Sequence, residues 1–177
     1  MSRVSSWLVV IIVVMLALLG GRADSAQDKY TLKVPDGLAF SEFRGYEDWQ
    51  TVAVSQPEGV LNAILANPAM ISAYRAGVPG NGKPFPDGSK IAKIQWKAKK
   101  NAEAPYAVLV PDTMKDVLLI VKDSKRFVDT GGWGYAQFNY DPASDAFSPE
   151  GTGAKCGAAC HTIVKAKDYI FTAYPRR

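Results

Sequence analysis

The sequence has 177 residues, 47% of them hydrophobic and 21% charged, a balance typical of one folded domain. Its 21 Lys and Arg exceed its 17 Asp and Glu only slightly, so we expect no nucleic-acid partner, which would need a clustered basic face. Two cysteines and one histidine all lie between Cys156 and His161. A single histidine excludes a zinc site with two histidines and a haem held by two histidines. A Ser-His-Asp hydrolase would have to use His161.

The N-terminal residues have the order of a secretory signal peptide. Arg3 supplies a positive charge, residues 7–21 contain no charged side chain, and small residues follow up to Ala26. The uncharged stretch is shorter than the ~20 residues of a membrane-spanning helix. We therefore predict a signal peptide over residues 1–26 and a periplasmic or secreted domain over residues 27–177. An uncleaved segment that tethers the domain to the inner membrane is the alternative.

The mature chain contains strand and helix patterns without an internal repeat. Asn67 and Pro68 predict the start of a helix that Gly77 ends. The pattern further predicts a helix at 161–171, with Ile170 and Phe171 packing inward, and strands at 46–55, 90–97, 106–110, 117–121 and 133–140, the third of which ends at Pro111. Strands and helices that do not alternate indicate an α+β fold with a mostly antiparallel sheet and a few helices.

The strand predicted at 90–97 has two distinct faces. Ala92, Ile94 and Trp96 point to one side, whereas Ile91 and Lys93 point to the other. Lys93 therefore shares a face with an apolar neighbour.

The segment Cys156-Gly157-Ala158-Ala159-Cys160-His161 is close to the attachment motif of c-type haem. In that motif two thiols bond to the haem, and the histidine after the second cysteine becomes the axial ligand of the iron. Two residues usually separate the cysteines; here there are three, so we expect the extra residue to bulge. We predict that Cys156 and Cys160 hold one haem c and that His161 ligates its iron. An export signal agrees with this prediction, because c-type haem is attached after export.

Two other interpretations of the segment stay open. A disulfide between Cys156 and Cys160 suits an oxidising compartment but does not explain the adjacent histidine. A zinc site with Cys156, Cys160 and His161 lacks an obvious fourth ligand, for which Asp168 is the candidate.

The second axial position of the iron separates two classes of function. Met70 and Met114 are the only methionines of the mature chain. Met70 lies on the apolar face of the predicted helix, where a core role is expected. A methionine ligand would give a six-coordinate electron carrier, whereas an open iron would bind small molecules.

Several segments between about Tyr46 and Pro175 resemble the cytochrome P460 family. These segments are Tyr46-Glu47-Asp48-Trp49, Pro84 to Lys93, Val121 to Phe127, Gly132-Trp133-Gly134-Tyr135 with Phe138, and Asp168-Tyr169-Ile170-Phe171-Thr172. The cysteine spacing is the clearest departure from the family's pattern. The resemblance implies a β-rich, cytochrome P460-like haem domain that is often a homodimer and is related to the β-sheet cytochromes c-prime.

The resemblance also implies a function. Enzymes of the family oxidise hydroxylamine at an open haem to which a strand lysine is covalently bonded, and Lys93 falls at that position, so it is the cross-link candidate. The resemblance thus implies a haem-dependent oxidoreductase that acts on hydroxylamine or nitric oxide and passes electrons to a small periplasmic acceptor such as a c-type cytochrome. Glu150, in the loop before Cys156, is the candidate base for this reaction. A non-catalytic cytochrome that binds nitric oxide or carbon monoxide is the alternative, beside the six-coordinate carrier.

Overall fold

The computed structural model describes residues 26–176 except residues 36 and 151–152, and it describes only the backbone of residues 153–156. The predicted signal peptide therefore lies almost entirely outside the described residues. Within the described part, no helix combines the length and the apolar character that crossing a membrane requires.

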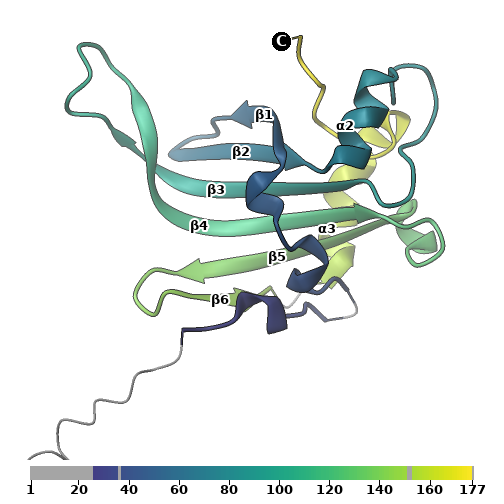
Figure 1. The fold of residues 1–177 in the computed structure, drawn as a ribbon, viewed down its shortest axis with the longest axis horizontal. Coiled ribbons are helices and arrows are strands. Elements are labelled where there is room, and N and C mark those ends of the chain that lie inside the picture. Colours follow the sequence, from purple (N-terminus) through teal and green to yellow (C-terminus); the bar gives the residue numbers. More distant parts are fainter. Residues whose placement is uncertain (1–25, 36, 151–152, 177) are drawn as a thin grey trace, which may run out of the picture.

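A six-stranded antiparallel sheet forms the centre of the fold, and its strands lie side by side in chain order (Figure 1). The strands are β1 (Gln50–Ser55), β2 (Val60–Ala66), β3 (Lys90–Lys100), β4 (Leu109–Lys122), β5 (Trp133–Asp141) and β6 (Ala146–Pro149). Two α-helices are described, α2 (Pro68–Arg75) and α3 (Gly153–His161). The 3₁₀ helices described are Lys29–Thr31, Phe40–Phe43, Tyr46–Asp48, Val128–Thr130 and Thr162–Lys167. This architecture confirms the predicted α+β fold.

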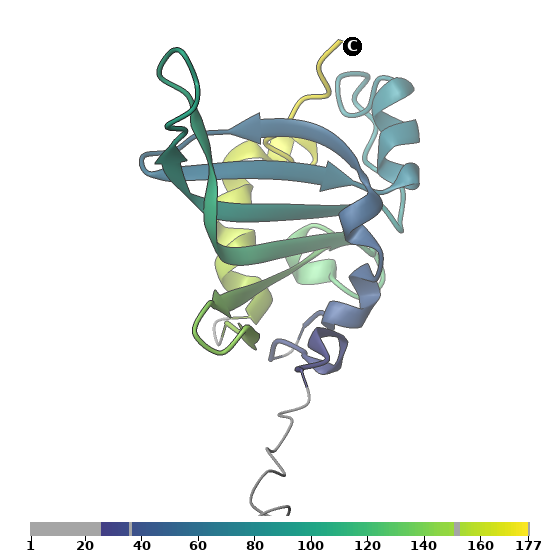
Figure 2. The same cartoon turned by 60° about the vertical axis from the view of Figure 1, so that its left-hand side comes forward.

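Alternate side chains of the same strands face two different layers, as the extended backbone requires. On what we call the solid face, Ala92, Ile94 and Leu119 pack against aromatic side chains of the N-terminal 3₁₀ helices. On what we call the cavity face, Ile91 and Ile120 belong to a separate cluster. Helix α3 packs on β5 at the cavity face (Figure 2). The two-faced strand predicted at 90–97 is thereby confirmed.

Helix α2 begins and ends as the sequence predicts. The side chain of Asn67 accepts a hydrogen bond from the backbone N–H of Met70, and Pro68 occupies the first helical turn, where its missing N–H costs nothing. Gly77 follows the helix with a φ of 88°, a conformation that glycine adopts without strain.

Several predicted boundaries are wrong, and the strands predicted at 106–110 and 117–121 both fall in one strand, β4, which begins at Leu109. The segment 46–55 begins with a 3₁₀ helix, so β1 starts only at Gln50. Strand β4 continues through Pro111, where the sequence predicts that a strand ends. At that point β4 pairs only with β3, and the register between the two strands is irregular. A proline, which has no N–H to donate, is tolerated at such an edge position. The helix predicted at 161–171 is misplaced, because the α-helix begins eight residues earlier, at Gly153, and ends at His161. Its Gly- and Ala-rich sequence carries little apolar periodicity, so the pattern does not locate it.

Candidate functional site

A cavity of about 460 Å³ lies on the cavity face, between the sheet and α3. Its walls are largely apolar and are formed by Ile64, Ile91, Leu118, Ile120, Ile170 and Phe171. Phe171 is half exposed rather than packed inward as predicted, whereas Ile170 is buried. An apolar cavity of this volume falls in the range of about 300–1,000 Å³ that cofactors and small ligands occupy.

Helix α3 presents the cysteines without the bulge that the sequence analysis expects. The backbone from Gly153 to His161 is continuous α-helix, in which residues four apart lie on the same side, about one turn from each other. Cys156 and Cys160 therefore occupy neighbouring turns of one side of the helix. Cys160 lines the cavity and carries a free thiol.

Gly157 allows α3 to approach β5 closely. A Cβ atom at this position would lie only 2.6 Å from the Cβ and Cγ atoms of Tyr135, a separation that side chains do not tolerate. The glycine between the two cysteines thus brings Cys160 and His161 onto the sheet.

The imidazole of His161 is oriented by a single strong hydrogen bond. Its Nδ1 lies 2.6 Å from the carbonyl oxygen of Tyr169, and because a carbonyl only accepts, Nδ1 carries the proton and donates it. This tautomer makes Nε2 the nitrogen with a free lone pair for a metal. The ring lies between those of Tyr135 and Phe171, with centroids 5.0 Å from each.

The pKa of His161 lies below its ordinary value. Burial is the main cause, the charge of Lys93 acts in the same direction, and the hydrogen bond to Tyr169 partly opposes them. His161 is therefore neutral at neutral pH, the form in which an imidazole binds a metal.

Lys93 extends from β3 into the same cavity, opposite Ile64 of β2 and Leu118 of β4. Burial lowers the pKa of its amine, with Asp116 opposing the shift. A larger fraction of the amine is then unprotonated than at an exposed lysine, and the unprotonated amine is the nucleophilic form.

Glu150 also reaches the cavity from the segment after β6. Its backbone N–H donates to the carbonyl oxygen of Gln137 at 2.8 Å, and its carboxylate accepts from the side-chain amide of Asn139 at 3.1 Å. Two contacts with β5 thus hold the candidate base at the cavity that Lys93 and His161 share.

Tyr135 is a site residue that the sequence analysis did not single out. Its ring lines the cavity, and its buried hydroxyl has no hydrogen-bond partner among the described residues. Burial raises the pKa of this hydroxyl, with the nearby carboxylate of Asp168 acting in the same direction, so it stays protonated. A buried hydroxyl without a partner costs about 1–3 kcal/mol, and a bound group that supplies an acceptor would remove this cost.

These residues fit a haem, whereas the additional ligand that each alternative requires, a methionine for the six-coordinate iron and Asp168 for zinc, does not line the cavity. Met70 is fully buried in the core and Met114 packs towards the solid face, and neither lines the cavity. Asp168, the candidate fourth ligand of the zinc alternative, instead forms an ion pair with Lys122.

An apolar cavity of cofactor size, next to a neutral histidine and the cysteine that precedes it, has the parts of a haem site. Comparison with known proteins agrees, because the family model of Cytochrome P460 matches residues 43–172. The chain therefore belongs to the cytochrome P460 family, and it is a haem-containing cytochrome. No curated protein matches the chain significantly.

Proposed function

We propose that this protein is an exported cytochrome with one haem c that oxidises hydroxylamine, or nitric oxide, and passes the electrons to a small acceptor. The observation that carries the proposal is the convergence of His161, Lys93 and Glu150, from three separate segments, on one cavity. Bound there, the haem would supply an iron that binds the substrate and accepts its electrons.

Helix α3 and His161 would hold the haem. Cys156 and Cys160, one helical turn apart, would be the two attachment points, and Nε2 of His161 would supply the lone pair that binds the iron. The hydrogen bond from Nδ1 to the Tyr169 carbonyl fixes the tautomer and the plane of the imidazole. The apolar walls of the cavity would shield the haem from water.

Lys93 is the proposed third attachment point. It lies on the cavity face, and its lowered pKa favours the nucleophilic amine. An amine attached to the haem would no longer carry a full positive charge, so the attachment would also remove the cost of burying that charge.

Glu150 would accept a proton from the substrate. Oxidation of hydroxylamine releases protons as well as electrons, and a carboxylate held at the cavity can receive them. Its hydrogen bond with Asn139 keeps the side chain at the cavity.

Mass spectrometry of haem peptides from the purified protein tests the proposal. We expect attachment at Cys156, Cys160 and Lys93, together with turnover of hydroxylamine in the presence of an artificial electron acceptor. Lys93→Met should lose the third attachment and the turnover, whereas Lys97→Met, an exposed position on the same strand, should keep both.

Two results would contradict parts of the proposal. Attachment through two thioethers alone, without turnover of hydroxylamine, would favour the cytochrome that binds nitric oxide or carbon monoxide. Haem that acid–acetone extracts from the native protein would contradict covalent attachment. Export is tested separately, by locating the mature protein in cell fractions and sequencing its N-terminus.

A further inference from the structure

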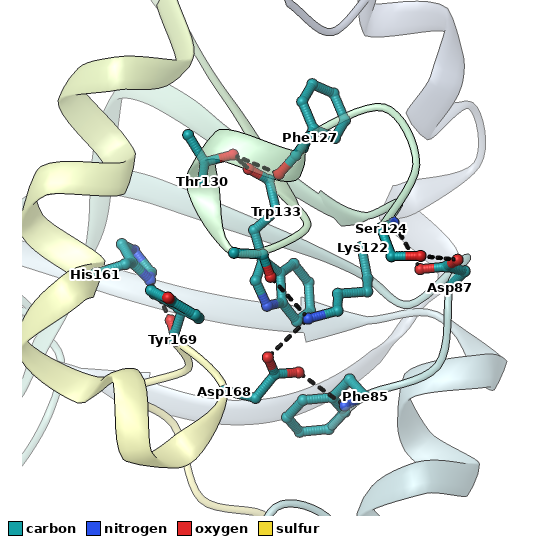
Figure 3. A network of polar contacts seen from close by, with 11 residues as sticks. Phe85, Asp87, Lys122, Ser124, Phe127, Thr130, Trp133, His161, Asp168 and Tyr169 are labelled. Atoms are coloured by element: carbon teal, nitrogen blue, oxygen red, sulfur yellow. Dashed lines mark hydrogen bonds and ion pairs between the residues drawn. The ribbon is translucent and has the colours of Figure 1, made fainter. Parts of the chain in front are cut away.

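A buried ion pair lies beside the loop that holds His161 (Figure 3). The Nζ atom of Lys122, at the end of β4, lies 2.7 Å from Oδ1 of Asp168, and the two side chains are only 7% and 11% exposed. The same Nζ donates to the carbonyl oxygen of Gly131 at 3.0 Å and lies 5.0 Å from the centre of the Trp133 ring. Lys122 therefore connects the C-terminal loop to the end of β4 and to the turn that precedes β5.

Asp168 is held from a second side. Its Oδ2 accepts a hydrogen bond of 2.8 Å from the backbone N–H of Phe85, in the loop that precedes β3. Both carboxylate oxygens are thus occupied, by groups 46 and 83 residues away in the chain. These contacts fix the Asp168 side chain to two distant segments, and they thereby hold the backbone of the C-terminal loop in position.

The backbone at Asp168 has an unusual conformation. Asp168 and Tyr169 have φ angles of 49° and 63°, in the left-handed region that residues other than glycine rarely adopt. Two successive residues in this conformation reverse the chain after the 3₁₀ helix, and the reversal aims the carbonyl of Tyr169 at His161.

Gly131 completes the arrangement from the side of Tyr169. A Cβ atom on Gly131 would lie 2.3 Å from the Tyr169 ring, so the ring packs directly on the bare backbone. The carbonyl of Gly131 also accepts the hydrogen bond from Lys122, so one lysine contacts both Asp168 and the glycine on which the Tyr169 ring packs.

We infer that Lys122 and Asp168 are positioning residues that set the electronic character of the axial ligand through the Tyr169 carbonyl. This inference rests on the proposed function, in which His161 ligates the haem iron. A strong hydrogen bond at Nδ1 makes Nε2 more electron-donating, which stabilises the oxidised iron and lowers its reduction potential. The ion pair holds the 2.6 Å geometry and thereby maintains this effect.

The test uses holoprotein with the changes Lys122→Met and Asp168→Asn. Resonance Raman spectra of the reduced protein give the iron–histidine stretching frequency, which rises with the strength of the hydrogen bond at Nδ1. We expect the stretch to move to lower frequency and to broaden in both variants, and the reduction potential to rise. Lys122→Arg, which keeps the positive charge, should lie closer to the wild type than Lys122→Met.

Glu42→Gln is the matched control, because it breaks another ion pair, with Arg126 at 2.8 Å, on the solid face. The control should keep the wild-type frequency and potential. Unchanged values in folded Lys122→Met and Asp168→Asn, or an equal shift in the control, would overturn the inference. If Lys122→Met does not fold, Asp168→Asn decides, since it preserves the size of the side chain. A wild type without covalent haem or an iron–histidine band would instead contradict the proposed function.

Discussion

The two faces of the sheet are made from the same strands, yet one is filled and the other encloses a cavity. The N-terminal segment places large rings on the solid face, where Phe40 lies 4.6 Å from Phe138 between ring centroids. On the cavity face, helix α3 contributes Gly157, Cys160 and His161 to the walls, and a cavity lies between it and the sheet. The segment that covers each face, more than the sheet itself, therefore decides whether that face can hold a ligand.

The largest expected effect comes from removing the two cysteines that would attach the haem in the cavity. With both Cys156→Ser and Cys160→Ser, we expect complete loss of thioether-bound haem, because no thiol remains to bond to it, and any covalent haem that is left would be attached through Lys93. Acid–acetone extraction followed by a pyridine haemochrome spectrum measures the bound fraction. Wild type treated in the same way is the control, and haem that resists extraction from the double variant would show attachment elsewhere.

Leu118 and Leu119 compare the two faces at neighbouring positions of β4. Leu119 is fully buried on the solid face, so Leu119→Ala should lower the free energy of unfolding by about 2–5 kcal/mol. Leu118 lines the cavity and is only partly buried by the protein, so Leu118→Ala should cost about 1 kcal/mol. Urea denaturation measures both values, and equal losses would mean that the cavity face is packed as tightly as the solid face.

Gly157→Ala tests how closely α3 must approach the sheet. The new methyl group would meet Tyr135 at 2.6 Å, so the helix must move or the ring must turn, at a cost of about 1–3 kcal/mol. Thermal unfolding and the haem content of the purified protein measure the effect. Ala159→Ser, on the exposed side of the same helix, should change stability by less than about 0.5 kcal/mol. A stable Gly157→Ala variant with full haem content would refute the tight contact.

The smallest expected effect lies on the solid face and depends on pH. Burial alone would raise the pKa of Glu42, but hydrogen bonds from Arg126 and from the backbone N–H of Ala39 outweigh it and bring the pKa below its ordinary value of 4.5. A lowered pKa stabilises the fold above pH 4.5, and this contribution is lost as the pH falls through the folded-state pKa.

The difference in unfolding free energy between wild type and Glu42→Gln should therefore be present at neutral pH and vanish in acid. Because the pair with Arg126 is partly exposed, we expect at most about 1 kcal/mol. Denaturation at a series of pH values measures the difference. A gap that persists below the lowered pKa would assign the effect to packing rather than to charge.

Much of the fold follows from local sequence. A period of two predicts which residues of β3 share a face, and this period alone is enough to place Lys93 beside an apolar neighbour. The cap formed by Asn67 and Pro68 predicts α2 in the same local way. The haem segment is found by its residue types, although its helical backbone is not.

The rest of the site depends on contacts between distant residues. The sequence pattern does not reveal that Lys122 is buried, because its partner Asp168 lies 46 residues further on. Tyr135 has the same pattern as other aromatic residues of β5, and only the cavity distinguishes its hydroxyl. Such features arise from the way separate segments meet, which no local pattern contains.

The order of the strands has a consequence for biogenesis. Each strand pairs with the next along the chain, so the sheet is complete at Pro149, before the segment with the two cysteines. Neighbouring hairpins form rapidly, because little chain entropy is lost in closing them. Under the export that we propose, in which the N-terminus emerges first, the sheet can thus form before the haem is attached to α3.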